Sequence, residues 1–270
     1  MEINKEYLQK YRNKEITFEE LSKLHNMCRP YFSKLFKKQG YKTNKVLNME
    51  DLNHNYFDKI DTYEKAYILG YFVADGNLEF RQDTKLKRIS FSCTKDDIEL
   101  LEFVKFNLNS NNNIHTSNKT YQVKNTNYVS KSMASFSVTS SNIFDKLTFL
   151  SYGCNKTYKE LSSPNLNNKL MWKFLLGLFD GDGCISYSIP RKRKHYNYSF
   201  SITSNSKRFL NHLYNFLKQN NIKSFIKKDN NSWKLLINSK KDILKIRNEF
   251  YKDINFGLER KRVKFMGIPS

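Results

Sequence analysis

The sequence lacks the segments that direct a protein into or across a membrane. No run approaches the roughly 20 consecutive apolar residues that a membrane-spanning helix needs. Residues 1–14 have no apolar core of the kind found in a secretory signal peptide. We therefore expect no secretion signal and no membrane partner.

Cysteine is also scarce, and its pattern excludes two kinds of cross-link. The four cysteines form no CxxC pair, and the five histidines show no zinc-ligand spacing with them. We expect reduced, buried thiols in place of disulfides or a zinc site. These cysteines are Cys28, Cys93, Cys154 and Cys184.

Acidic residues are too few to balance the basic ones. The 47 Lys and Arg against 26 Asp and Glu give a formal charge of +21, while 39% apolar residues suffice for a packed core. A large positive excess indicates polyanionic partners, and with membranes disfavoured this points to nucleic acid. The abundance of Asn, Lys and Tyr is typical of an AT-rich coding sequence, so charge alone does not settle function.

The N-terminal part of the chain, residues 1–44, is predicted to be a small helical module. Thr17 and Glu20 have the spacing of a capping box, which marks the start of a helix. Its apolar residues then fall on one face. These are Phe18, Leu21 and Leu24.

A second helix is predicted over residues 29–38, because Pro30 suits a first helical turn and Gly40 suits the position after a helix end. Two short helices joined by a tight turn resemble a helix-turn-helix DNA-binding module. The alternative is a basic helical hairpin that only packs on its neighbour. If the module binds DNA, the candidate contacts on the second helix are Lys34 and Lys37.

The rest of the chain repeats itself. Residues 68–76, ILGYFVADG, recur as residues 175–183, LLGLFDGDG, and residues 90–94, SFSCT, recur as residues 199–203, SFSIT. Two further elements follow in the same order in both copies, which indicates a duplicated unit. The predicted boundaries are a linker over 45–61, a first unit over 62–160 and a second unit over 161–270.

Each unit is predicted to run helix, strand, strand, helix, strand, strand, helix. Leu78 and Phe80 alternate with polar residues, which indicates a strand with one packed and one outward face. We therefore predict an α+β fold of two αββαββα units related by a pseudo-two-fold axis. Their antiparallel sheets would form a saddle, and the N-terminal domain would be small and all-α.

The repeated nine-residue element is an apolar helix with small residues four positions apart. Gly70 and Ala74 share one helix face, as do Gly177 and Gly181. Two such helices can approach backbone to backbone, which would justify the cost of glycine in a helix. The helices are predicted to end at glycines that can adopt left-handed conformations. These are Gly76 and Gly183.

Pairing of these helices would bring Asp75 and Asp182, which are 182 − 75 = 107 positions apart, to a common end. Two carboxylates at the negative ends of helix dipoles repel each other. A hard divalent cation, Mg²⁺ or Mn²⁺, resolves this conflict with oxygen ligands. Such a site is suited to phosphodiester hydrolysis.

These residues resemble the LAGLIDADG motif of homing endonucleases, and the resemblance covers residues 62–265. It implies that Asp75 and Asp182 are the metal-binding catalytic acids. It also implies a basic residue near the scissile phosphates in each half, at positions that Lys156 and Lys261 occupy. Val73 departs from the motif's first acid, whereas the second copy keeps it as Asp180.

The resemblance further implies that the outward sheet faces enter the major groove of double-stranded DNA. The candidate contacts on the strands and on the tips of the two hairpins are Asn77, Glu79, Arg81, Lys85, Lys87, Arg88, Ser186, Ser188, Arg191, Lys192, Arg193 and Lys194.

The implied activity is double-strand cleavage at a long asymmetric site by a monomer, in a bacterial or phage-infected cytoplasm or an organelle. Two alternatives stay open: a maturase that binds group I intron RNA, and a regulator that binds DNA without cutting it. Retention of both aspartates disfavours a purely binding role.

Overall fold

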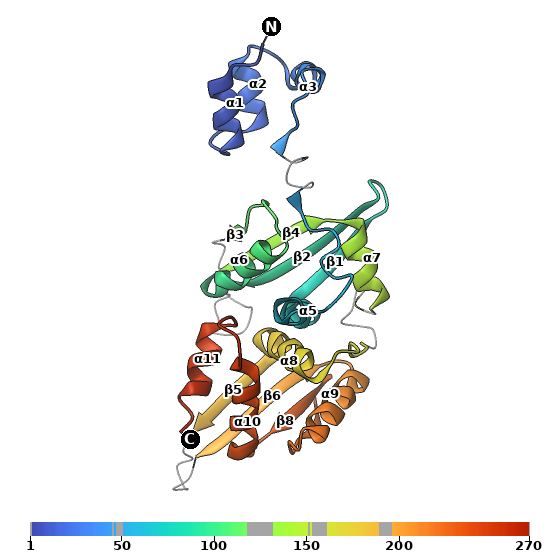
Figure 1. The fold of residues 1–270 in the computed structure, drawn as a ribbon, viewed down its shortest axis with the longest axis vertical. Helices are drawn as coiled ribbons and strands as arrows, with labels where there is room; N and C mark the ends of the chain where they lie inside the picture. Colours follow the sequence, from blue (N-terminus) through green and yellow to red (C-terminus); the bar gives the residue numbers. More distant parts are fainter. Residues whose placement is uncertain are drawn as a thin grey trace. The chain divides into compact units, whose positions relative to one another are not determined.

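The structure is a computed structural model that describes residues 2–44, 46, 51–117, 132–150, 152, 161–188 and 196–269. The chain divides into two compact units, Met1–Leu52 and Asn53–Ser270 (Figure 1). No helix in these described stretches is long and apolar enough to span a bilayer.

In the part of the N-terminal unit that the structure describes, a helical bundle consists of α1 (Lys5–Arg12), α2 (Phe18–Leu24) and α3 (Arg29–Lys38). The predicted capping box is present at α2, where Thr17 Oγ1 accepts from the Glu20 amide and Glu20 Oε2 accepts from the Thr17 amide. Gly40 adopts the left-handed conformation predicted after α3, with φ +77°. The core of the unit consists of Ile3, Tyr11, Leu21, Phe32 and Phe36.

Two features of this unit differ from the sequence prediction. Helix α1 was not predicted, and it contributes Tyr11 to the core. Leu24 was predicted to share the buried face of α2 but is 46% exposed. Since α1 and α3 both pack on α2 near Leu21, the short helix needs no second apolar contact at its C-terminal end.

The second unit contains two αββαββα halves, as predicted. In the first half the elements are α5 (Tyr63–Asp75), β1 (Gly76–Arg81), β2 (Leu86–Thr94), the 3-10 turn η1 (Lys95–Asp97), α6 (Ile98–Asn107), β3 (His115–Ser117), β4 (Met133–Thr139) and α7 (Ser141–Phe149). All strand pairs are antiparallel, in the order β1-β2-β4-β3.

The second half repeats this arrangement, and its described residues end with a further helix. Its elements are α8 (Asn168–Asp182), β5 (Gly183–Ser188), β6 (Asn197–Ser204), α9 (Lys207–Gln219), β7 (Phe225–Asp229), β8 (Ser232–Ile237), α10 (Lys240–Tyr251) and α11 (Glu259–Met266). The sheet order is β5-β6-β8-β7, also antiparallel. The predicted α+β fold with two related sheets is therefore confirmed.

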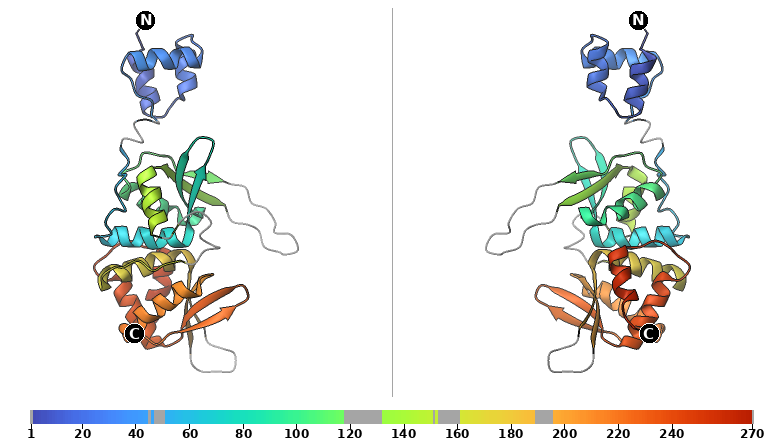
Figure 2. Two further views of the ribbon diagram at one scale, coloured as in Figure 1. Left: turned by 90° about the vertical axis from the view of Figure 1, so that its right-hand side faces the viewer. Right: turned by 90° about the vertical axis from the view of Figure 1, so that its left-hand side faces the viewer.

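Helices α5 and α8 lie side by side at the centre of this unit, and the strands of both sheets extend toward the same side of the pair (Figure 2). Each sheet buries one face, as Phe91 and Phe136 show in the first half and Phe200 and Ile202 in the second. Phe80 departs from the predicted alternation, because it lies near the hairpin tip and is 41% exposed.

The expectation of buried cysteines holds for Cys93 and is wrong for two others. Cys28 precedes α3 and Cys184 lies on β5, and both are exposed. Each lies on a surface away from the packed faces, so its thiol contributes little to the core.

Candidate active site at the ends of the paired helices

The small residues of the repeated motif form the contact between α5 and α8. A Cβ atom on Gly70 would overlap the carbonyl oxygen of Phe174 and lie 2.9 Å from the Leu178 nitrogen. A Cβ atom on Gly177 would overlap the Tyr67 carbonyl oxygen in the same manner. The two helices therefore touch backbone to backbone, as the glycine spacing predicted.

The glycines at the helix ends have a different role from the predicted one. Gly76 and Gly183 have φ values of −81° and −92° with extended backbones, so neither is left-handed. A Cβ atom on Gly76 would lie 2.6 Å from Cε2 of the Phe72 ring, and one on Gly183 would overlap the Phe179 ring. Glycine is required there because the strand leaves the helix directly beneath an aromatic ring.

The predicted catalytic acids lie at the C-terminal ends of the paired helices. Asp75 is the last residue of α5 and Asp182 the last of α8, and both are exposed. The Asp75 carboxylate lies against the neighbouring helix, since a Cβ atom on Gly181 would be 2.9 Å from Asp75 Oδ2. The structure thus brings the two motif ends together, with Gly181 directly before Asp182.

No cluster of three or more His, Cys, Asp or Glu side chains with metal-binding geometry occurs among the described residues. The two aspartates are therefore the candidate anionic ligands at this end of the helix pair. The rest of a coordination shell would have to come from neutral oxygens, such as water, backbone carbonyls or a phosphate ester.

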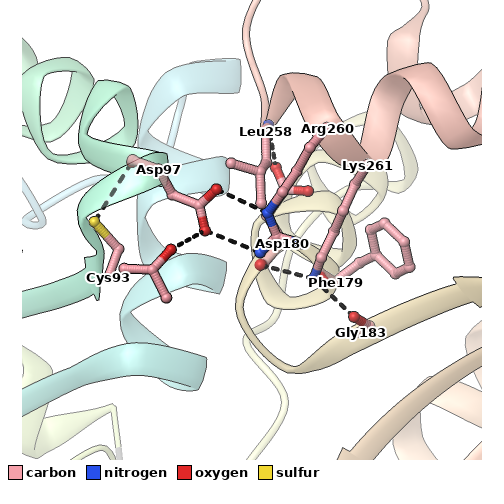
Figure 3. A network of polar contacts seen from close by, with 9 residues as sticks. Cys93, Asp97, Phe179, Asp180, Gly183, Leu258, Arg260 and Lys261 are labelled. Carbon is pink, nitrogen blue, oxygen red and sulfur yellow. Dashed lines mark hydrogen bonds and ion pairs between the residues drawn. The ribbon is translucent and has the colours of Figure 1, made fainter. Parts of the chain in front are cut away.

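Asp180, the other motif acid, lies within the protein. It is 3% exposed, and its Oδ2 accepts hydrogen bonds from the Tyr67 hydroxyl at 2.7 Å and from the Leu258 amide at 2.8 Å. Burial raises the pKa of the Asp180 carboxyl to about 6, while these two donors act in the opposite direction. Asp180 thus joins α5, α8 and the start of α11, and Figure 3 shows its contact with Leu258.

Lys261, predicted to lie near a scissile phosphate, is 6% exposed and caps α8. Its ammonium donates to three carbonyl oxygens, those of Phe179 at 2.6 Å, Asp180 at 2.8 Å and Gly183 at 2.7 Å (Figure 3). These bonds use all three of its N–H donors. Burial lowers the pKa of Lys261 to about 8, so the side chain stays charged at neutral pH.

The neighbouring Arg260 points to the first half of the unit. Its guanidinium donates to both carboxylate oxygens of Asp97, at 2.7 and 2.9 Å, and Asp97 is 4% exposed. The Thr94 hydroxyl also donates to Asp97 Oδ2 at 2.9 Å. One helical turn of α11 therefore contacts both halves (Figure 3).

The predicted DNA contacts of the first hairpin divide between two faces. Cross-strand pairing puts Glu79 opposite Arg88 on the outward face, where Glu79 Oε1 also accepts from Arg81 at 2.6 Å. Asn77 and Lys85 are exposed as predicted.

Lys87 differs from the other predicted contacts of this hairpin. The register puts it on the same side of β2 as the buried Ile89. There its ammonium is paired with the Asp145 carboxylate of α7, at 2.5 and 2.7 Å.

In the second half, Ser186 and Ser188 are exposed on the outward face of β5. The predictions at Lys156, Arg191, Lys192, Arg193 and Lys194 lie outside the described residues. In the N-terminal unit, both Lys34 and Lys37 are exposed on α3.

The outward faces also include polar residues that the sequence analysis did not select. They lie on the later strands, and the cross-strand register assigns them to the same faces as Asn77 and Ser186. A hairpin alignment of each pair of strands would have found them, because register fixes which residues share a face. They are Ser90, Ser135, Ser137, Asn197, Ser199, Ser201, Thr203, Lys227 and Lys234.

The sequence of part of the second half matches a known protein family. A family model described as a LAGLIDADG-like domain matches residues 169–251, which run from the first turn of α8 to the end of α10. This stretch is a LAGLIDADG-like domain. The resemblance inferred from the repeated motif is therefore confirmed. No curated protein matches the chain.

Solved structures show that the fold extends over both halves. The LAGLIDADG homing endonuclease I-LtrWI, bound to its target DNA, has 17% identity and a TM-score of 0.52, covering 77% of this chain and 89% of its own. I-GzeII in complex with its DNA target has 15% identity and a TM-score of 0.51, covering 74% and 87%. The meganuclease I-AabMI, bound to uncleaved DNA, has 13% identity and a TM-score of 0.52 over the same shares. At these identities the likeness establishes the LAGLIDADG fold.

Proposed function

We propose that the protein is a site-specific endonuclease that cuts both strands of DNA at a long asymmetric site. The observation that carries this proposal is the juxtaposition of Asp75 and Asp182 at the end of a glycine-packed helix pair. A purely structural helix pair has no need of two exposed acids at its negative ends. The LAGLIDADG-like sequence of residues 169–251 supports the same conclusion.

Double-stranded DNA is the proposed substrate because of the two outward sheet faces. Each face carries hydroxyl, amide and basic side chains in cross-strand register, the type of surface that a β-ribbon presents to base edges in the major groove. The formal charge of +21 favours a polyanion, and the similar structures I-LtrWI, I-GzeII and I-AabMI are complexes with DNA. Because the two faces differ in most residues, the site would be asymmetric.

The donor set fits a hard divalent cation, which we propose to be Mg²⁺, with Mn²⁺ as an alternative. Asp75 and Asp182 are hard oxygen donors, both exposed at the negative ends of the paired helices, where a cation between them would offset their charges. When bound, such an ion would lower the pKa of a water molecule and stabilise the leaving oxygen of the phosphodiester.

The chain's own residues give this site its shape. Lys261 neutralises the carbonyl end of α8 and fixes its last turn, so the Asp182 carboxylate is presented from a rigid helix end. Its donors are already occupied, so we propose that Lys261 acts by positioning and through its charge. For Lys156 we keep the prediction of a basic group near the other scissile phosphate.

We further propose that the N-terminal unit is a second DNA-binding module. Helix α3 has no acidic residue, and its exposed surface carries basic side chains around Tyr31, which is 61% exposed. A positively charged helix that follows a tight turn is suited to the major groove. The exposed basic residues are Arg29, Lys34, Lys37 and Lys38.

Cleavage of a randomised DNA library in the presence of Mg²⁺, with sequencing of the cut ends, tests the nuclease proposal. The wild-type protein should cut both strands at one preferred site. Asp75→Asn and Asp182→Asn should each reduce cleavage at least about a hundredfold while DNA affinity changes little, because binding depends on the sheets. Full activity in either variant would remove the site assignment, and a library bound but uncut would favour the maturase or the regulator.

Deletion of residues 2–44 tests the second module. The truncated protein should keep the thermal unfolding of the larger unit but protect a shorter stretch of DNA from a footprinting nuclease. Loss of positive charge should also weaken the affinity for DNA. The slope of log affinity against log salt concentration should become shallower by about one unit per lost phosphate contact. A footprint of unchanged length would show that α3 does not contact DNA.

A further inference from the structure

The first turn of α11 is one place where the two halves are tied together outside the paired helices, and the ring contact between Phe103 and Phe256 is another. Two consecutive side chains leave this turn in opposite directions. Arg260 contacts Asp97 in the first half, and Lys261 contacts the carbonyl end of α8 in the second half. The same turn starts at Leu258, whose amide binds Asp180. Three contacts within four residues therefore connect α11 with both motif-bearing halves.

The Arg260–Asp97 contact has the geometry of a specific attachment. It is bidentate, and the carboxylate is 4% exposed, whereas a chance surface ion pair is monodentate and solvated. Asp97 is itself held in place by the Thr94 hydroxyl, and the Cys93 thiol donates to its carbonyl at 3.4 Å. Contacts within the first half therefore orient the Asp97 carboxylate independently of Arg260.

The repeat gives this attachment a counterpart. Asp97 precedes α6, and the equivalent residue before α9 is Ser206, 206 − 97 = 109 positions later. Ser206 Oγ accepts from the backbone amide of Leu161, at 3.3 Å and in a buried position. In each case, a segment that follows the sheet of one half contacts the residue directly before α6 or α9 in the other half. Only the Arg260–Asp97 contact is charged.

We infer that Arg260 and Asp97 form an inter-half latch, a pair of positioning residues that holds the ends of α5 and α8 in register. The inference deepens the proposed function, on which it rests for its catalytic consequence. Glycine packing leaves the helix pair without interlocking side chains at Gly70 and Gly177, and the latch adds to the Tyr67–Asp180 hydrogen bond in resisting rotation or sliding of one half against the other. The latch supplies that resistance close to the carboxylates, through α11 and Lys261.

The test compares four variants of the full-length protein: Arg260→Ala, Arg260→Lys, the double variant Asp97→Asn with Arg260→Ala, and Arg262→Ala as the matched control. Arg262 lies on the same helix, but its guanidinium is over the Tyr251 ring of the second half. The double variant matters because Arg260→Ala alone leaves a buried carboxylate without its cation. Thermal unfolding of each variant identifies any that fail to fold.

In single-turnover cleavage, Arg260→Ala and the double variant should be slower by about tenfold or more, because small misplacements of catalytic groups are costly. They should require more Mg²⁺ for half-maximal rate, while DNA affinity stays within about twofold and Arg260→Lys recovers part of the rate. Amide hydrogen exchange should become faster in the last turns of both α5 and α8. Arg262→Ala should match the wild type in all of these measurements.

Hydrogen exchange keeps the latch testable if the wild-type protein cuts no DNA. In that case the proposed function fails, while faster exchange at the ends of both helices in the double variant would still support the latch. Exchange and Mg²⁺ dependence identical to the wild type in the double variant would overturn it. So would a loss of rate that only follows a loss of thermal stability and DNA affinity.

Discussion

The two motif helices share two glycines, one at the helix contact and one after the helix end, and the same terminal acid, but they differ at other positions. At the position of Asp180 in α8, helix α5 has Val73, and at the position of Tyr67 in α5, helix α8 has Phe174. Asp180 and Tyr67 form a buried hydrogen bond across the helix pair. The equivalent pair across the pseudo-two-fold axis, Val73 and Phe174, is apolar.

The comparison separates features that both helices contain from contacts that differ between the two halves. The glycines and the terminal aspartates occur in both copies because each is needed for the close contact of the helices or for the proposed chemistry. The inner acid and its hydroxyl partner occur together in one version, and the other version has two apolar residues at these positions, so the Tyr67 hydroxyl has an acceptor where it occurs. The duplicated chain thus keeps its geometry on both sides while the chemistry of its contacts differs.

The largest expected effect on stability comes from adding a side chain at the glycines where α5 and α8 touch. Gly70→Ala and Gly177→Ala should each lower the free energy of unfolding by about 3 kcal/mol or more, because the new Cβ overlaps a backbone carbonyl that cannot move alone. Urea denaturation of both variants measures this. Gly40→Ala, where nothing lies within 4 Å, should cost only about 1 kcal/mol from its positive φ. A cost below about 1 kcal/mol at either helix would contradict the close contact.

A smaller effect is expected when Asp180 is replaced by valine, the residue that the first half has at the equivalent position 73. Asp180→Val should cost about 2–4 kcal/mol, because it leaves the buried Tyr67 hydroxyl and the Leu258 amide without an acceptor. Adding Tyr67→Phe should recover about 1 kcal/mol of this, since one orphaned donor is removed. A double-mutant cycle by thermal or urea unfolding gives the coupling. Strictly additive costs would show that the two side chains do not act as a pair.

The smallest effect concerns the outward faces. Arg88→Ala should reduce the slope of log affinity against log salt by up to about one, because it removes one cation near the phosphates. Ser186→Ala, on the first strand of the other sheet, should leave that slope unchanged and alter affinity only at the bases it contacts. Fluorescence titration at several salt concentrations distinguishes the two. Equal slopes for both variants would place Arg88 away from the phosphates.

Much of this architecture was predictable from sequence because it depends on spacing. The four-residue interval of Gly70 and Ala74, repeated at Gly177 and Gly181, predicted the helix contact, and strand alternation predicted the two sheets. Thr17 and Glu20 predicted the start of α2 correctly because a capping box is a local pattern.

What could not be predicted depends on contacts between distant segments. Nothing in the sequence around Lys261 indicates that its ammonium binds three carbonyls of α8, or that Arg260 pairs with Asp97 in the other half. Gly76 and Gly183 were assigned a left-handed backbone because glycine most often ends helices in that way. The actual cause is an aromatic ring from the preceding turn, which only the three-dimensional packing reveals.

The direct passage from helix to strand at Asp75–Gly76 and Asp182–Gly183 restricts how the protein can change. Since no loop separates the acid from the sheet, one inserted residue would rotate every following side chain to the opposite face and carry the outward sheet surface away from the acid. Hairpin tips can lengthen or shorten without that penalty. Changes that preserve this arrangement are therefore confined to substitutions along the strands and to length changes at their far ends, while these two peptide junctions keep a fixed length.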